Sequence, residues 1–336
     1  MTVTVFYPED QYANIEIERE IFGDGITIAG RTTGAIDEMT DAECAATNGL
    51  MIQRIAVTRA HMQRFPNLKC IVRMGVGYDK LDRVAAAERG IVICNVPDYG
   101  TTEVADHAIT LAMTLRRGII HYHDTQRADP VAPWRPLMTG GLVRRSGVQT
   151  FGIVGLGRIG TAAALRAKAL GFRVVFFDPN LPNGAELAIG VERARTLEAL
   201  LIQCDVLSIH APLTRETRGM IGGKELAQLK PGAVFVNTAR GPIADLDGLY
   251  DSLKSGHLAA AGIDVVPIEP PVAPLPRLIA AYRAREPWLT GRLVITPHSA
   301  YYSPEAHHDT RVKAAETMRA ALLSNRPQNV ITPDMD

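Results

Sequence analysis

Three side chains that could carry out chemistry stand at or soon after the ends of apolar runs in the second half of the chain: Arg240, Glu269 and His298. An arginine guanidinium binds a carboxylate through two parallel hydrogen bonds. A histidine imidazolium can donate a proton near neutral pH, and a carboxylate at its far ring nitrogen would orient the ring and favour the protonated form. The set therefore predicts a site in which Arg240 holds the carboxylate of a 2-oxo acid. His298, oriented by Glu269, would protonate the carbonyl oxygen as hydride arrives.

Each of these residues also has a purely structural explanation. Arg240 could be a solvated arginine at a strand end, Glu269 a loop residue among prolines, and His298 the cap of a turn after Pro297. Most residues of these types are structural when taken singly. The placement of all three around one predicted cleft is what favours chemistry.

The stretch from Thr150 to Asp178, TFGIVGLGRIGTAAALRAKALGFRVVFFD, predicts where the hydride would come from. An apolar run leads into Gly155, Gly157 and Gly160, and a segment rich in Ala and Leu with helical spacing follows. A glycine-rich turn can serve helix–strand packing alone, but strand, tight turn and helix in this order also bring backbone N–H groups to a dinucleotide pyrophosphate. Asp178 ends the next apolar run, where its carboxylate would bind the adenosine ribose and repel a 2′-phosphate. With no Arg directly after it, Asp178 favours NAD over NADP.

Short apolar runs alternate with helical patterns along the whole chain. This alternation predicts parallel strands with crossover helices, hence an α/β protein with two doubly wound parallel-sheet domains. We expect a discontinuous flavodoxin-like substrate domain (residues 1–101 and 297–336) and a Rossmann NAD-binding domain (residues 102–296). The predicted strands of the first domain are Val3–Tyr7, Ile26–Ala29, Gly49–Ile52, Cys70–Arg73 and Ile91–Cys94. Those of the second are 150–154, 173–177, 205–210, 233–237, 258–264 and 292–296.

The strand ends of the second domain carry the predicted cofactor site, because ligands bind outside the carboxyl ends of strands in open parallel sheets. Beyond the glycine turn and Asp178, the residues at these ends are His210, Ala211, Pro212, Thr238, Ala239, Arg240, Asp264 and His298. We expect all of them to face one crevice.

Four connecting segments have distinct patterns. Thr102–Ile120 predicts one long hinge helix behind a Thr cap, and Asp124–Gly147 an excursion over the surface or onto a partner subunit. Pro270–Leu293 is rich in proline with a short helix-like centre and predicts an inserted loop. Pro304–Ser324 predicts a helix that packs back on the first domain.

The composition excludes several classes of protein. The 36 basic and 36 acidic residues balance, which gives no electrostatic reason to bind nucleic acid or an anionic membrane. No apolar run is long enough to span a bilayer, and the start, MTVTVFYPED, lacks the features of a secretory signal. The four cysteines are widely spaced without a CxxC pair, as in a reduced cytoplasmic protein. We expect no metal, because neither His121 with His123 nor His307 with His308 has a third ligand in reach.

Longer motifs resemble one known family. The runs NTARG (237–241), GIDVVPIEP (262–270) and ITPHSAYYS (295–303), with RMGVGYDKLD (73–82), NVP (95–97) and HAPLTRET (210–217), are similar to the D-isomer-specific 2-hydroxyacid dehydrogenases. Through GLGRIG, LRAKALGF, VNTARG and TPHSAYYS the chain most resembles the C-terminal-binding-protein branch. The resemblance implies NAD-dependent interconversion of a 2-oxo acid and a D-2-hydroxy acid, an Arg240–Glu269–His298 active site, and a homodimer through the cofactor domain.

The resemblance also implies roles for further residues. Gly75, Val76 and Gly77 would present backbone N–H groups to the substrate carboxylate, with Val76 also near the nicotinamide. The remaining implied cofactor contacts are Arg158 and Ile159 at the pyrophosphate, Ala211 at the nicotinamide ribose, Thr238 on the cofactor, and Asp264 at the carboxamide. Formate and phosphite are disfavoured as substrates, because formate dehydrogenases carry Gln in place of Glu269 and phosphite dehydrogenase carries Lys in place of Val76.

Two residues, Tyr301 and Arg73, could affect which substrate binds. Two alternatives to the dehydrogenase function also stay open. Tyr301 stands where the corepressor branch has Trp, and Arg73 could read a second anionic group or merely pair with an acidic neighbour. One alternative is an NAD-sensing interaction protein of the corepressor type, although a pure sensor need not keep an acid/base pair. Another is a phosphoglycerate-type dehydrogenase, whose pocket would need several cations.

Overall fold

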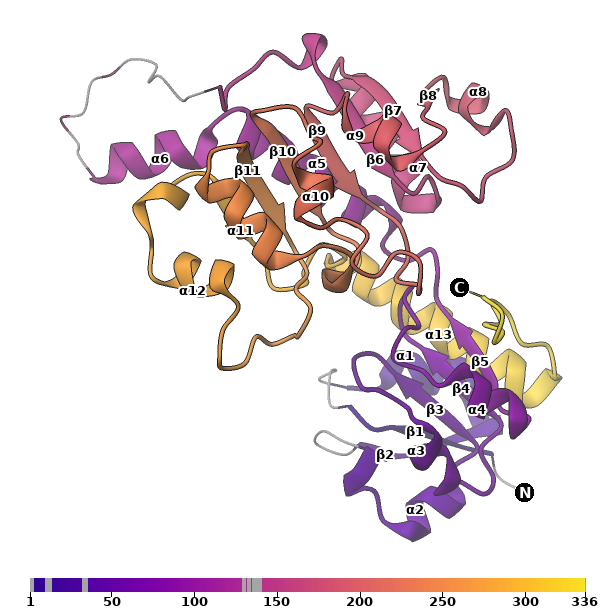
Figure 1. Cartoon of the computed structure of the whole chain (residues 1–336). Helices are drawn as coiled ribbons and strands as arrows, with labels where there is room; N and C mark the ends of the chain where they lie inside the picture. Colours follow the sequence, from indigo (N-terminus) through magenta and orange to yellow (C-terminus); the bar gives the residue numbers. More distant parts are fainter. Residues whose placement is uncertain are drawn as a thin grey trace. The chain divides into compact units, whose positions relative to one another are not determined.

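The computed structural model describes residues 3–9, 14–31, 36–128, 131, 134 and 141–335 (Figure 1). The chain forms two compact units: unit 1 is Met1–Gly100 with Tyr302–Asp336, and unit 2 is Thr101–Tyr301. Residues 297–301, which we predicted in the first domain, lie in unit 2. They do so because the N–H groups of His298, Ser299 and Ala300 are all bonded to Asp264.

Unit 1 is built on a five-stranded parallel sheet in the order β2-β1-β3-β4-β5. Its strands are β1 (Val3–Tyr7), β2 (Ile26–Arg31), β3 (Gly49–Ile52), β4 (Cys70–Arg73) and β5 (Val92–Asn95). Its α-helices are α1 (Glu16–Phe22), α2 (Asp41–Ala46), α3 (Arg59–Gln63), α4 (Arg83–Glu88) and α13 (Pro304–Ser324). Every residue of β3 is buried, because strands of a parallel sheet are covered on both faces.

Helix α13 returns the chain to unit 1 and is held there by a buried ion pair. The guanidinium of Arg311 donates to both carboxylate oxygens of Glu18 on α1, with Nε–Oε1 2.8 Å and Nη2–Oε2 2.7 Å. The guanidinium also donates to the backbone oxygen of Asn14 at 2.8 Å. Glu18 is fully buried, so its charge depends on this partner.

We predict that Glu18→Gln lowers the free energy of unfolding by about 3–5 kcal/mol, because the Arg311 charge would stay buried without its counter-charge. Chemical denaturation followed by circular dichroism measures the change. The matched control is Glu88→Gln, which breaks an exposed ion pair with Arg59 in the same unit. Exposed pairs contribute little, so this control should unfold as wild type. Equal effects of the two substitutions would contradict the prediction.

Unit 2 is built on a seven-stranded parallel sheet in the order β12-β11-β10-β9-β6-β7-β8. Its strands are β6 (Thr150–Val154), β7 (Arg173–Phe177), β8 (Glu192–Arg193), β9 (Val206–Ile209), β10 (Ala233–Asn237), β11 (Leu258–Ile263) and β12 (Leu293–Ile295). The predicted fold class, two parallel-sheet α/β domains, is confirmed. The strand that the sequence missed, β8, is two residues long and has no apolar run to reveal it.

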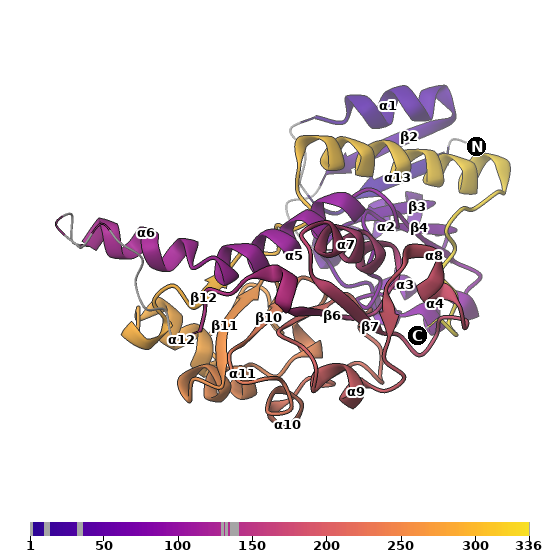
Figure 2. The ribbon, with the colours of Figure 1, turned by 90° about the horizontal axis from the view of Figure 1, so that it is seen from above.

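Helices cover both faces of the unit 2 sheet. Helices α5 and α7 pack side by side on one face, and α9, α11 and α12 contribute to the core on the other (Figures 1 and 2). The α-helices are α5 (Thr101–Arg116), α6 (Ile119–Ala128), α7 (Arg158–Ala169), α8 (Ala185–Ile189), α9 (Leu197–Leu201), α10 (Gly223–Leu226), α11 (Leu246–Lys254) and α12 (Arg277–Arg283). Among the described residues, no helix is both long and apolar enough to cross a bilayer.

The predicted hinge helix, Thr102–Ile120, is in fact two helices. Gly118 has φ +62°, and this left-handed residue interrupts the helical backbone between the end of α5 at Arg116 and the start of α6 at Ile119. Residues 124–128, which we predicted as irregular, belong to α6. Of the rest of the predicted excursion, 129–130, 132–133 and 135–140 lie outside the described residues.

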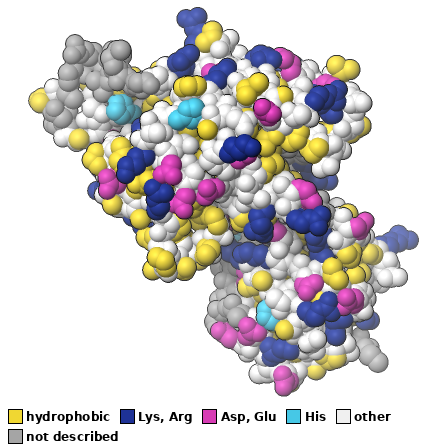
Figure 3. Space-filling view, in the orientation of Figure 1, with side chains coloured by type: hydrophobic (Ala, Val, Ile, Leu, Met, Phe, Trp, Pro, Cys, Tyr) yellow, Lys and Arg dark blue, Asp and Glu magenta, His cyan; other side chains and the backbone are white. Residues whose placement is uncertain are grey.

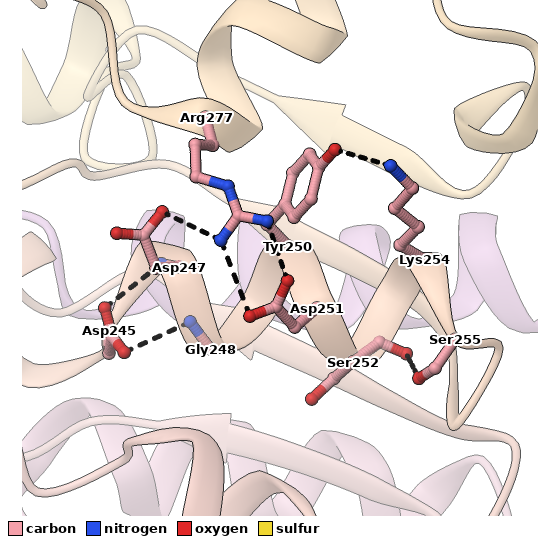
Figure 4. A network of polar contacts seen from close by, with 9 residues as sticks. All are labelled: Asp245, Asp247, Gly248, Tyr250, Asp251, Ser252, Lys254, Ser255 and Arg277. Carbon is pink, nitrogen blue, oxygen red and sulfur yellow. Dashed lines mark hydrogen bonds and ion pairs between the residues drawn. The ribbon is translucent and has the colours of Figure 1, made fainter.

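The inserted segment 270–293 is more ordered than a loop. Helix α12 buries Leu278 and Ile279 in the core of unit 2. On its outer side the Arg277 guanidinium bonds Asp251 of α11 at 2.9 Å and lies 4.1 Å from the centre of the Tyr250 ring (Figure 4). The insertion is therefore docked on α11.

Basic and acidic side chains are intermixed on the face of the molecule in Figure 3, as the balanced composition predicts. On this face no large area carries charge of a single sign.

Candidate active site

The glycine turn after β6 is shaped by close packing at two of its three glycines. Gly155 has φ +86°, and a Cβ there would lie 2.8 Å from the backbone nitrogen of Ala211. A Cβ on Gly160 would lie 2.0 Å from the carbonyl oxygen of Gly155. Both positions therefore require glycine for the turn to close against the helix and the end of β9.

Gly157 is different, since a Cβ there would meet no described atom within 4 Å. Gly157 is the N-cap of α7 with φ −73°, and both it and Arg158 are exposed. No described side chain caps the N–H groups of this helix. The packing of the protein thus gives no reason for glycine here, whereas a pyrophosphate approaching the backbone does. The turn fits a dinucleotide.

Asp178 joins the end of β7 to the glycine turn. Its Oδ2 accepts from the N–H of Leu156 and its Oδ1 from the N–H of Asn180, each at 2.9 Å. Each carboxylate oxygen has a second lone pair, which could accept from a ribose hydroxyl.

The ends of β9 and β10 hold two buried polar atoms with no partner among the described residues, His210 Nδ1 and Thr238 Oγ1. His210 Nε2 lies 2.9 Å from Ser208 Oγ, and burial lowers the pKa of His210 to about 4, so the ring is neutral at pH 7. Buried polar atoms are nearly always hydrogen-bonded. Unpaired atoms at strand ends therefore point to a polar ligand.

The turn carrying Arg240 is shaped by Asn237, which the sequence analysis did not single out. Its side-chain amide donates to the Arg240 carbonyl at 3.0 Å, and its Oδ1 accepts from the N–H of Ala239 at 3.0 Å. A Cβ on Gly241 would lie 2.0 Å from the carbonyl carbon of Val266, so this turn lies directly against the segment that leads to Glu269. Arg240 is half-buried, and its Nη1 donates to the Ala239 carbonyl at 2.8 Å.

Glu269 and His298 are in direct contact, with Oε2 and Nδ1 2.6 Å apart. The other oxygen of Glu269 accepts from the N–H of Val266 at 3.0 Å, which fixes the carboxylate. Because Nδ1 is bonded to a carboxylate, Nε2 is the ring nitrogen that can exchange a proton with a ligand. The Tyr301 ring lies edge-on to His298, with ring centres 6.2 Å apart.

Asp264 holds the loop that carries His298, a role we did not predict beside its expected cofactor contact. Its Oδ1 accepts from Thr296 Oγ1 at 2.5 Å and from the N–H of Ser299 at 2.9 Å, and its Oδ2 accepts from the N–H of Ala300 at 3.0 Å. Its backbone carbonyl accepts from the N–H of His298 at 2.8 Å. Asp264 is buried, so these donors satisfy its charge.

The residues predicted to hold the substrate from the first domain form the turn after β4, in unit 1. The guanidinium of Arg73 folds over Gly75, where a Cβ would lie 1.5 Å from Nη1. The Asn95 side chain donates to the Val76 carbonyl at 2.7 Å, and the N–H of Val96 donates to the Gly75 carbonyl at 3.2 Å. Strand β5 thus fixes this turn.

Comparison with known proteins agrees with the site. Residues 109–300 match the family model "D-isomer specific 2-hydroxyacid dehydrogenase, NAD binding domain". Glyoxylate reductase of Thermococcus litoralis is 34% identical over 83% of this chain and 81% of its own. C-terminal-binding protein 1 of Caenorhabditis elegans is 32% identical over 94% of this chain, which spans only 42% of that protein's length. The structure of a glyoxylate reductase from Paecilomyes thermophila superimposes with a TM-score of 0.83 at 26% identity, covering 100% of this chain and 99% of that one.

The glycine turn, the matched NAD-binding domain and the likenesses to two glyoxylate reductases over most of the chain agree with one another. The likeness to C-terminal-binding protein 1 supports the branch that the motifs indicated. The chain therefore belongs to the D-isomer specific 2-hydroxyacid dehydrogenase family: it carries the NAD-binding domain of this family, whose members act on the CH–OH group of their substrates.

Proposed function

We propose that this protein is an NAD-dependent D-2-hydroxyacid dehydrogenase that interconverts a 2-oxo acid and a D-2-hydroxy acid. The observation that carries the proposal is the 2.6 Å contact between Glu269 Oε2 and His298 Nδ1. It leaves an imidazole Nε2 for proton transfer in the same unit as a turn that fits a dinucleotide.

The proposed mechanism assigns one task to each residue. Arg240 holds the substrate carboxylate through paired hydrogen bonds. His298 gives its Nε2 proton to the carbonyl oxygen during reduction, and the Glu269 carboxylate stabilises the imidazolium before that transfer. Bound NADH supplies the hydride. In oxidation His298 accepts the hydroxyl proton instead.

The proposed cofactor contacts follow the features described above. The N–H groups at Gly157, Arg158 and Ile159 would bind the pyrophosphate, and Asp178 the adenosine ribose. The strand-end residues that would contact the rest of the cofactor are Gly155, Gly160, His210, Ala211, Pro212, Thr238, Ala239 and Asp264, with His298 at the nicotinamide.

Unit 1 would contribute the turn after β4. Gly75, Val76 and Gly77 would bind the substrate carboxylate, Val76 would also lie near the nicotinamide, and Tyr301 of unit 2 would form an aromatic wall. Arg73 would bind a second anionic group of the substrate.

We also propose a homodimer through the NAD-binding domain in a cytoplasmic setting. Exposed apolar side chains after α5 and beyond α6 support an interface there, with Ile119 54% and Trp134 92% exposed. Four buried thiols without a disulfide suit a reducing compartment.

A second candidate function is NAD-dependent interaction with other proteins. It is favoured by the 32% identity with C-terminal-binding protein 1. It predicts assembly that depends on NADH together with negligible turnover.

The test measures the decrease in absorbance of reduced nicotinamide when the purified protein and NADH are mixed with a 2-oxo acid. The acids are glyoxylate, pyruvate, hydroxypyruvate, phenylpyruvate, 2-oxoglutarate and oxaloacetate. We expect turnover of at least one acid, with slower turnover for NADPH because Asp178 repels its 2′-phosphate. Tight NADH binding with no turnover of any acid would favour the interaction protein instead.

A further inference from the structure

We propose that His107, Thr296 and Asp264 form a hydrogen-bonded relay that positions the catalytic loop 297–301 and ties it to helix α5. The relay rests on the proposed function, because it acts through His298. None of its members would touch the reacting atoms, so His107 and Thr296 are positioning residues.

The relay joins the two places where the chain enters and leaves unit 2. Helix α5 begins at Thr101, the first residue of this unit, and carries His107 six residues further on. Thr296 directly precedes the catalytic loop, which ends at Tyr301, the last residue of the unit. A single set of side chains thus holds together helix α5 and the loop that bears His298.

The hydrogen bonds have a definite direction. Thr296 has one hydroxyl proton, and the 2.5 Å distance to Asp264 Oδ1 assigns that proton to the carboxylate, which has none to give. The 3.0 Å contact between Thr296 Oγ1 and His107 Nε2 must then be a bond in which the ring N–H donates. His107 Nε2 is also 3.9 Å from Asp264 Oδ1. The order is therefore His107 to Thr296 to Asp264.

Asp264 connects these hydrogen bonds to the catalytic loop. Its carboxylate accepts from the N–H groups of Ser299 and Ala300, and its carbonyl accepts from the N–H of His298. The backbone of His298 has φ +53°. Residues other than glycine rarely adopt this left-handed conformation, and it persists only when the surrounding structure fixes it. Bonds to residues 298, 299 and 300 supply that constraint and set the ring against Glu269.

The Thr296 hydroxyl is the most direct test. Thr296→Val keeps the shape but removes the proton that Oδ1 receives, so the loop should shift and kcat should fall about 10- to 100-fold, since small displacements at a reacting centre have effects of this size. KM for NADH should stay within about 2-fold. Thr296→Ser restores the hydroxyl and should restore most of kcat.

His107 gives a second, independent pair of variants. His107→Gln keeps an N–H donor and His107→Leu removes it, so only the second should lower kcat. The matched control is His257→Leu, because His257 is also half-buried with Nε2 3.1 Å from a carbonyl oxygen, that of Leu226, and lies outside the relay. His257→Leu should turn over like wild type.

A readout that does not need turnover separates the relay from the proposed function. The His298 Nδ1 proton in the bond to Glu269 should give a low-field proton NMR signal, assigned by its loss in His298→Ala. In Thr296→Val and His107→Leu this signal should shift or broaden. It should persist unchanged in Thr296→Ser, His107→Gln and His257→Leu.

The possible results distinguish the relay from a purely structural network and from a failure of the proposed function. Variants that lose thermal stability but keep both kcat and the NMR signal would overturn the relay and leave it a structural network. If Thr296→Val does not fold, the His107 pair decides. A wild-type protein that turns over no 2-oxo acid would overturn the proposed function, and the NMR signal would still decide the relay.

Discussion

Replacement of His298 by alanine is expected to lower kcat by about 10²- to 10⁴-fold, the usual contribution of a positioned general acid. The physical reason is that the His298 imidazole, held by Glu269 at 2.6 Å, is the proposed donor of the proton to the carbonyl oxygen. NADH affinity should change little, because His298 is only one of the proposed cofactor contacts and the glycine turn and Asp178 are untouched. Steady-state kinetics on the best 2-oxo acid and a fluorescence titration with NADH measure the two quantities.

His308→Ala is the matched control for this prediction, because His308 is exposed on α13 in the other unit. It should leave kcat unchanged. Glu269→Gln keeps a hydrogen-bonding side chain but removes the charge, so its kcat should fall between wild type and His298→Ala. Wild-type turnover in His298→Ala would exclude this residue as the acid.

The second large effect is expected for Arg240→Ala, which should reduce kcat/KM by about 10²- to 10⁴-fold. Two charge-assisted hydrogen bonds to the substrate carboxylate would be lost, each contributing about 1.5–3 kcal/mol. The Kd for NADH should stay within about 2-fold, since the proposed role is to hold the substrate. Initial-rate kinetics and NADH titration on the same preparation measure both.

Arg240→Lys should recover only part of this loss, because an ammonium group cannot form the paired bonds of a guanidinium. Arg173→Ala serves as control, since Arg173 begins β7 and pairs with Glu192 at an exposed position. If Arg240→Ala weakened NADH binding as much as it weakened turnover, its proposed role at the carboxylate would be contradicted.

The sequence alone predicted six of the twelve described strands to the residue and five others to within two residues. Gly49–Ile52, Cys70–Arg73, Thr150–Val154 and Ala233–Asn237 are apolar runs, and the structure has strands with these bounds. Strands of a parallel sheet are buried on both faces, so they read as continuous apolar stretches that need no knowledge of their neighbours. The glycine turn was predictable for a similar reason, since its spacing reflects local backbone geometry.

Local signals failed where they were short or ambiguous. Strand β8 has only two residues, and the turn at Gly118 that divides the predicted hinge helix sits within a continuous helical pattern. A single glycine is tolerated inside many helices, so its left-handed conformation was not visible in the sequence.

Only the tertiary structure decided how distant segments support the site. Arg277 of the predicted loop contacts Asp251 and Tyr250, which lie more than twenty residues earlier in the sequence. The same segment places Leu278 and Ile279 in the core of unit 2. In the same way, Asp264 was predictable as a strand-end carboxylate, but its bonds to the His298 loop were not. Strand and turn patterns depend on residues that are neighbours in the sequence. The partner of a buried carboxylate depends instead on which loops the completed sheet brings together.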